Sequence, residues 1–136
     1  MTRRPIVLCV DDMEENLRVR TLLLQQFGYE TLAAGDHRSA VRAAAEENVD
    51  LVVIDYHLAN GESGEDVARD VRTVKPRVPL IMLTGDVHLP KSAHDSVDAV
   101  VVKGLSSPGE LFDTIQRLLP PELQPRKPML FPEAKQ

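Results

Sequence analysis

Five polar residues stand directly after short apolar runs of the sequence. Asp11 and Asp12 form an adjacent pair after the first run, and Asp55 follows the third run. Thr84 and Lys103 follow the fourth and fifth runs. If each run is a strand of one parallel sheet, these side chains meet at its carboxyl edge, where open α/β sheets bind their ligands. The sequence therefore predicts one pocket that contains three carboxylates, a hydroxyl and an amine.

The charges of this pocket indicate its chemistry. Three neighbouring carboxylates raise one another's pKa unless a cation lies among them. Carboxylate oxygens suit Mg²⁺, which typically binds one or two carboxylates together with water and phosphate oxygens. Lys103 offers a point charge for a phosphate, and an Asp carboxylate can itself be the nucleophile that forms an aspartyl phosphate. We therefore expect Mg²⁺ and a phosphoryl group at this pocket.

The apolar runs predict the strands that position these residues. Three runs are continuous rather than alternating, which is typical of strands buried on both faces of a parallel sheet. The run over residues 29–33 is more polar and fits an edge strand. The expected strands are Ile6–Val10, Tyr29–Ala33, Leu51–Ile54, Leu80–Leu83 and Ala99–Val102.

Helical patterns lie between the runs. A helix is expected over Glu14–Phe27, and Asp36 can cap the next one. Capping-box patterns predict a helix after Ser63 and another with Pro108 at its first position. Few apolar residues precede the last run, so Pro90 begins at most a short helix there. Strands that alternate with helices predict an α/β domain with a doubly wound, three-layer architecture.

Composition bounds the class of protein. The 136 residues carry 16 Lys+Arg against 21 Asp+Glu, a formal charge of −5, which argues against nucleic-acid binding. The single cysteine, Cys9, lies in an apolar run and is expected to be a small buried hydrophobe. No apolar stretch is long enough for a membrane span or a secretory signal. We therefore expect a cytoplasmic protein.

The domain is expected over residues 1–119, with a proline-rich tail over residues 120–136. The tail holds five of the ten prolines and shows no helix or strand pattern, so an extended chain is expected. Its apolar triplet Met129–Phe131 is either part of a mobile end or docks on this domain or a partner.

The order of the polar residues is similar to that of a known family. The matching segments are Asp11-Asp12, Asp55–Leu58, Leu83–Gly85 and Val101–Lys103. With these segments, residues 5–119 resemble the receiver domain of two-component response regulators. The resemblance implies a flavodoxin-like, five-stranded parallel sheet of order 2-1-3-4-5.

The resemblance also implies a set of metal ligands. Asp12 and Asp55 would bind Mg²⁺ directly, together with the backbone carbonyl of His57. Asp11 would act mainly through metal-bound water. These residues also have structural interpretations, since Asp11 or Asp12 could simply cap the helix that follows.

The remaining roles concern the phosphoryl group. Asp55 resembles the phosphoacceptor, Thr84 would hydrogen-bond the phosphoryl group and shift on activation, and Lys103 would pair with a phosphoryl oxygen. His57 and Asp86 lie two residues past Asp55 and Thr84, where side chains flank the phosphoryl group in relatives. We expect these two side chains to meet and to modulate dephosphorylation.

Three features depart from the family pattern. Gly104 replaces the usual proline after Lys103, so no cis bond is expected there. Val100 occupies the position of the usual aromatic switch residue. The stretch over residues 84–103 is short, which predicts a short or irregular fourth helix on the face that normally carries output.

The combined interpretation is a stand-alone receiver, a phosphorylation-controlled switch rather than an enzyme with a separate substrate. A histidine kinase or histidine phosphotransfer protein would donate the phosphoryl group, and output would be by protein contact without a DNA-binding domain. Two alternatives stay open: an unphosphorylated pseudo-receiver adaptor, and a haloacid dehalogenase-type phosphatase, whose Asp-x-Asp motif is absent here. A homodimer is also left open.

Overall fold

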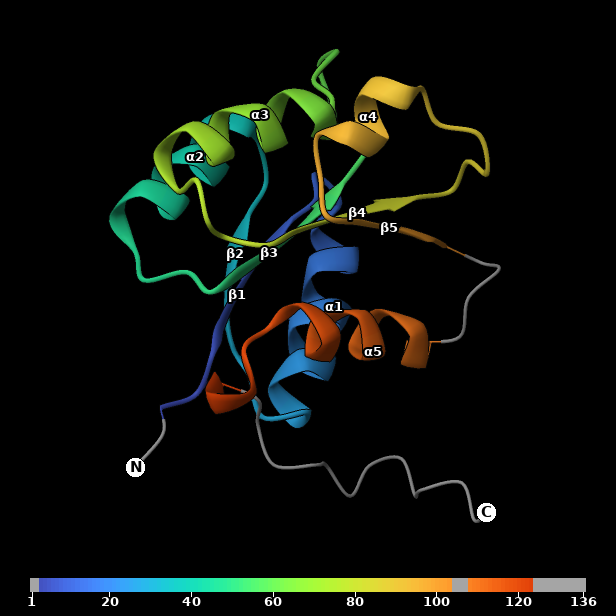
Figure 1. The fold of residues 1–136 in the computed structure, drawn as a ribbon. Helices are drawn as coiled ribbons and strands as arrows, with labels where there is room; N and C mark the ends of the chain where they lie inside the picture. The colour runs from blue at the N-terminus through green and yellow to red at the C-terminus, as the bar shows by residue number, and fades with distance from the viewer. Residues whose placement is uncertain (1–2, 104–107, 124–136) are drawn as a thin grey trace.

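The computed structural model describes residues 3–103 and 108–123, which place one parallel sheet between two layers of helices (Figure 1). The sheet order is β2-β1-β3-β4-β5, and every pairing of neighbouring strands is parallel. The predicted fold class and strand order are therefore confirmed. The strands are β1 (Ile6–Val10), β2 (Glu30–Ala34), β3 (Leu51–Asp55), β4 (Leu80–Thr84) and β5 (Ala99–Val102).

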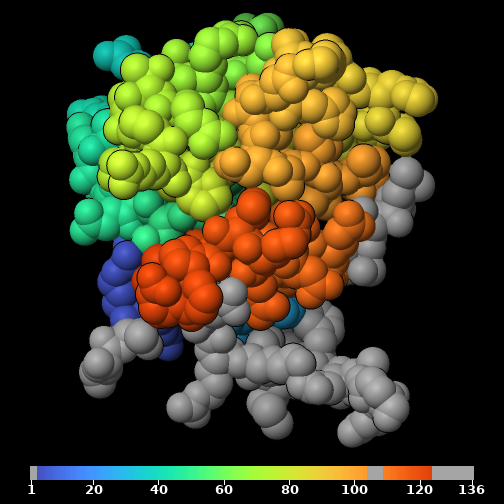
Figure 2. Space-filling view, viewed as in Figure 1, coloured from blue at the N-terminus to red at the C-terminus, as the bar shows by residue number. Residues whose placement is uncertain are grey.

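The helices divide between the two faces of the sheet. α1 (Glu14–Gln26) and α5 (Pro108–Leu118) cover one face. α2 (His37–Glu46), α3 (Gly64–Val74) and α4 (Lys91–Asp95) cover the other. In Figure 2, α3 and α4 lie side by side above α5. α4 has five residues, so the prediction of a short fourth helix is confirmed.

Two hydrophobic clusters explain why the strand sequences are continuous. Leu8 of β1 packs into the cluster beneath α2 and α3, whereas its neighbour Cys9 packs into the cluster beneath α1 and α5. Alternate residues of a strand point to opposite faces, so both must be apolar when both faces are covered. On the second face, the rings of Phe27 and Phe112 stack with centroids 3.6 Å apart. Cys9 is fully buried, as expected, and burial raises the pKa of its thiol to about 12.

β2 begins one residue later than the predicted run. Tyr29 is buried, but its N–H donates to the carbonyl of Leu24 at the end of α1. The hydrogen bonds between β2 and the segment leading into β1 start at Glu30, whose N–H donates to the carbonyl of Pro5. A helix-terminal hydrogen bond therefore takes the place of a strand bond at the first position.

The residues at the ends of the helices form the glycine turn and the side-chain caps that their types predict. Gly28 has a φ of 96°, which ends α1 in the left-handed region. The Asp36 carboxylate accepts a hydrogen bond from the Ser39 N–H at 2.8 Å and caps α2. The Ser63 hydroxyl accepts from the Asp66 N–H and caps α3. These two caps confirm the predictions made for them.

The first part of the expected tail differs from the prediction of an extended chain. Pro121–Leu123 forms one turn of 3₁₀ helix, closed by a hydrogen bond from the Leu123 N–H to the Pro120 carbonyl. The fixed φ of a proline suits the start of such a turn. Two predictions concern residues outside the described ranges, namely the triplet Met129–Phe131 and the peptide bond before Gly104, and both stay predictions. The domain boundary at residue 119 also stays a prediction.

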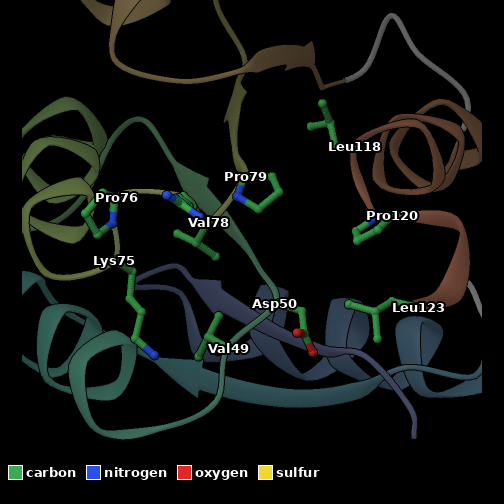
Figure 3. A pocket seen from close by; sticks show the side chains of 10 residues that line it. Val49, Asp50, Lys75, Pro76, Val78, Pro79, Leu118, Pro120 and Leu123 are labelled. Atoms are coloured by element: carbon green, nitrogen blue, oxygen red, sulfur yellow. The ribbon is translucent and has the colours of Figure 1, made fainter. Parts of the chain in front are cut away.

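The turn borders a groove of about 530 Å³ at the amino ends of β3 and β4 (Figure 3). Leu118, Pro120 and Leu123 form one wall, and the segment from Lys75 to Pro79 forms the other. This groove lies at the opposite end of the strands from Asp11, Asp12 and Asp55. Among residues 3–103 and 108–123, no helix is long and apolar enough to span a membrane.

Candidate functional site

The three predicted carboxylates meet at the carboxyl edge of the sheet. Asp55 is the last residue of β3, and Asp11 and Asp12 directly follow β1, the neighbouring strand. One carboxylate oxygen from each of the three lies within 4.8 Å of the others. Asp11 and Asp55 are buried, whereas Asp12 is accessible. The sheet topology therefore builds the acidic cluster that the sequence predicts.

Two of the candidate site residues belong to their strands rather than following them. β3 and β4 each extend one residue beyond the predicted run, to Asp55 and Thr84. Asp55 is in register with Leu83, and Thr84 with Val102. The backbones of both residues are therefore fixed by the sheet ladder, which holds their side chains in place at its edge.

Asp55 forms an ion pair with Lys103. The Lys103 Nζ lies 3.0 Å from Asp55 Oδ1, and the Asp55 side chain is only 8% exposed. Burial raises the pKa of Asp55; the hydrogen bond and charge of Lys103 oppose that rise, and the charge of Asp11 adds to it. The net pKa lies above the ordinary value, so burial outweighs the ion pair.

Thr84 is fully buried, and its hydroxyl oxygen accepts a hydrogen bond from the Asp86 N–H at 2.9 Å. The hydroxyl proton remains able to donate to a group in the site. The Lys103 N–H in turn donates to the Thr84 carbonyl. One backbone hydrogen bond thus joins the last residue of β4 to the residue that follows β5.

His57 and Asp86 form a second pair, between side chains that are exposed. His57 Nε2 lies 3.0 Å from Asp86 Oδ2. The expected contact between them is therefore present, although the two residues are 29 positions apart. Tyr56 lies edge-on to the His57 ring.

Gly64 has a role that the sequence pattern does not reveal. A Cβ at this position would lie 2.5 Å from the Asp55 carbonyl oxygen, 2.8 Å from Met82 Sδ and 2.9 Å from Tyr56 Cα. Its N–H also donates to the Tyr56 carbonyl at 2.7 Å. The first residue of α3 is therefore packed directly against the backbone of the phosphoacceptor candidate, which only glycine permits.

Arg20 of α1 is a charged residue of the site that sequence reasoning missed. Its Nη1 lies 3.3 Å from Asp11 Oδ2. The spacing offered a signal, because Arg20 falls three residues after Leu17 and four before Leu24, on the apolar face of the helix. A charge at such a position needs a buried partner.

The alternative role of Asp11 or Asp12 as a helix cap is not what the structure shows. The residue before α1 is Met13, and no side chain caps that helix. Asp11 Oδ1 instead accepts from the Met13 N–H at 2.9 Å, outside the helix. This leaves the acidic cluster at the sheet edge, with oxygen donors of the kind that fit Mg²⁺.

The family of the chain follows from comparison with known proteins. The response regulator receiver domain matches residues 7–116, and the chain belongs to this family. The response regulator MtrA of Mycobacterium tuberculosis, a DNA-binding protein by name, is 37% identical over 106 residues, which are 78% of this chain and 42% of that protein. The chain thus spans about two fifths of the length of this relative.

Solved structures agree with the family. The chemotaxis protein CheY4 of Vibrio cholerae superposes with a TM-score of 0.78 at 27% identity, covering 86% of this chain and 100% of that one. The response regulator TrrA of Thermotoga maritima, solved in complex with Mg²⁺ and BeF, gives 0.75 at 32% identity, covering 85% and 99%. The resemblance predicted from the sequence is confirmed: the chain is a receiver domain, a signalling module of two-component systems rather than a true enzyme.

Proposed function

We propose that this chain is a phosphorylation-controlled switch in which Asp55 accepts a phosphoryl group from a histidine kinase or a histidine phosphotransfer protein. The ion pair between Asp55 and Lys103, next to Asp11 and Asp12, is the observation that carries this proposal. It provides a nucleophilic carboxylate, a cation for phosphoryl oxygens and two further acids for a metal ion. Histidine kinases are the general partners of the family, and the cytoplasm is its usual location.

The transfer is a substitution at phosphorus. The bond between phosphorus and the donor imidazole nitrogen breaks, its electron pair stays on the imidazole, and a carboxylate oxygen of Asp55 forms the new bond. The Lys103 ammonium balances charge on the phosphoryl oxygens, and the Thr84 hydroxyl donates a hydrogen bond to one of them. Burial of Asp55 excludes water from the resulting acyl phosphate.

Asp12, Asp55 and the backbone carbonyl of His57 would hold Mg²⁺, with Asp11 acting through a metal-bound water. The three carboxylates lie close together, and Asp12 is accessible to solvent. This arrangement suits a hard cation that retains water ligands. When bound, Mg²⁺ supplies charge neutralisation for the transferring phosphoryl group. A relative that contains Mg²⁺ with BeF supports this assignment.

Output is proposed to occur through contact of this domain with a protein partner or a second copy. Val100 of β5 packs against the cluster beneath α2 and α3, where relatives usually have an aromatic residue. A ring that rotates inward therefore cannot be part of this switch. We propose that a shift of Thr84 toward the phosphoryl group acts on the neighbouring short helix α4.

Intact-mass analysis after incubation with acetyl phosphate tests the proposal. The wild type should gain one phosphoryl group when Mg²⁺ is present and none when it is chelated. Asp55→Asn should gain none, and Asp113→Asn, which changes an exposed acid on α5, should behave as the wild type. Unchanged mass of the wild type would instead favour the adaptor alternative.

Repeated turnover of a substrate distinguishes the phosphatase alternative from a receiver. A haloacid dehalogenase-type enzyme would hydrolyse small phosphomonoesters repeatedly, whereas a receiver exchanges a single phosphoryl group on its own aspartate. The family match and the absence of the Asp-x-Asp motif after β1 both favour the receiver.

A further inference from the structure

Arg20 forms an ion pair inside the acidic site that the family resemblance does not assign. It projects from α1, and its guanidinium Nη1 lies 3.3 Å from Asp11 Oδ2. The Arg20 side chain is 13% exposed, and that of Asp11 is fully buried. A guanidinium stays charged at every ordinary pH, so the pair places a fixed positive charge beside the carboxylate cluster.

This pair solves an electrostatic problem of the metal-free site. A buried carboxylate is costly unless it is paired and hydrogen-bonded. Asp11 satisfies both conditions, because Oδ1 accepts from the Met13 N–H and Oδ2 faces Arg20. Lys103 does the same for the other buried acid, Asp55. Each buried carboxylate of the cluster therefore has its own internal cation.

The charge of Arg20 also acts on Asp55. Burial raises the pKa of Asp55, and Arg20 opposes that rise together with Lys103, which acts more strongly. The cluster is compact, with carboxylate oxygens within 4.8 Å of one another. A cation that contacts one member is consequently close enough to act on all three.

We propose that Arg20 is a positioning residue that sets the Mg²⁺ affinity of the site, by holding Asp11 as an internal counter-ion and competing with Mg²⁺ for the acidic cluster. This inference rests on the metal site given under Proposed function. Two cations that share one carboxylate cluster repel each other, and each weakens the attraction that the other feels. By thermodynamic linkage, Mg²⁺ must weaken the Arg20–Asp11 pair by the same factor as the pair weakens Mg²⁺ binding.

The competition has a consequence for the domain. When Mg²⁺ is absent, the charge of Arg20 offsets the repulsion among the three carboxylates, so the fold does not depend on metal. With Mg²⁺ bound, the metal takes over part of that neutralisation, and Arg20 contributes less to stability. The site is thereby tuned for a metal that binds weakly and exchanges readily.

Mg²⁺ titration by isothermal calorimetry tests this on the full chain. Arg20→Gln removes the charge but retains an amide donor for Asp11, and it should bind Mg²⁺ at least ~5-fold more tightly than the wild type. Arg20→Lys keeps the charge and should remain near the wild type. Arg18→Gln is the matched control, because it removes the same charge from an exposed position of the same helix and should leave the affinity unchanged.

Thermal unfolding gives an independent readout. The melting temperature of Arg20→Gln should fall below that of the wild type in EDTA, and this gap should narrow in saturating Mg²⁺. Equal Mg²⁺ affinities of wild type and Arg20→Gln, or equal shifts in Arg20→Gln and Arg18→Gln, would overturn the inference. Absence of Mg²⁺ binding to the wild type would overturn the metal site itself and this inference with it.

Discussion

Replacement of Gly64 by alanine tests how tightly α3 is packed against Asp55. The added Cβ would lie 2.5 Å from the Asp55 carbonyl oxygen and 2.9 Å from Tyr56 Cα, distances far below ordinary contact. Both atoms belong to the backbone, so neither can rotate away as a side chain could. Relief requires α3 to move off the end of β3.

The magnitude follows from the two opposing effects. Overpacking a well-packed site costs about 1–3 kcal/mol, and contact with backbone places Gly64→Ala near the top of that range. Alanine recovers about 0.5–1 kcal/mol because glycine loses more conformational entropy when a helix forms. The net loss is about 2 kcal/mol in the free energy of unfolding, a fall of roughly 8 °C in melting temperature for a domain of this size.

Thermal and urea denaturation, followed by circular dichroism, measure this loss. Gly85→Ala is the control, because nothing lies within 4 Å of the position of its added Cβ. If Gly64→Ala and Gly85→Ala unfold at the same temperature and urea concentration, the packing of α3 against the end of β3 is not as close as described.

Three further perturbations have definite expected outcomes. Burial raises the pKa of Asp55, so its ionised form destabilises the fold above the ordinary Asp pKa. Asp55→Asn should therefore be more stable than the wild type at neutral pH in EDTA, and urea denaturation at a series of pH values should show this gain shrink as the pH falls through the raised pKa and disappear below about 4, where the wild-type carboxyl is protonated in both states. His57→Ala and Asp86→Ala should each change the rate at which the phosphoryl group is lost, measured by mass against time, and wild-type rates in both would show that the pair does not reach the site. Truncation after Leu119 should lower the free energy of unfolding by about 1 kcal/mol relative to truncation after Leu123, because it removes the turn that lines the groove in Figure 3. The melting temperature should fall with it, and equal melting temperatures of the two truncated chains would contradict this.

The parts of the fold that the sequence predicts are those governed by local pattern. The continuous run Leu51–Ile54 indicates a strand buried on both faces, and the caps at Asp36 and Ser63 rest on hydrogen bonds within four residues. The residues at which strands end are harder to predict from the sequence, because pairing with a neighbouring strand decides them. Asp55 joins β3 through its register with Leu83, a residue far along the chain.

The site could be predicted where strand topology alone brings residues together. Asp11, Asp12 and Asp55 meet because β1 and β3 are neighbours. The roles of Arg20 and Gly64 depend instead on which way a helix face is turned and how closely a helix approaches a strand. Such contacts are set by tertiary packing and leave only a weak trace in sequence spacing.

The most direct test of the proposed switch asks whether Asp55 is the residue that carries the phosphoryl group. Reduction of the acetyl phosphate-treated protein with borohydride converts an aspartyl phosphate to homoserine, and peptide mass spectrometry then locates it. Homoserine is expected at position 55, dependent on Mg²⁺ during phosphorylation. Homoserine at position 11, 12 or 86, or at no position in a protein that binds Mg²⁺, would contradict it.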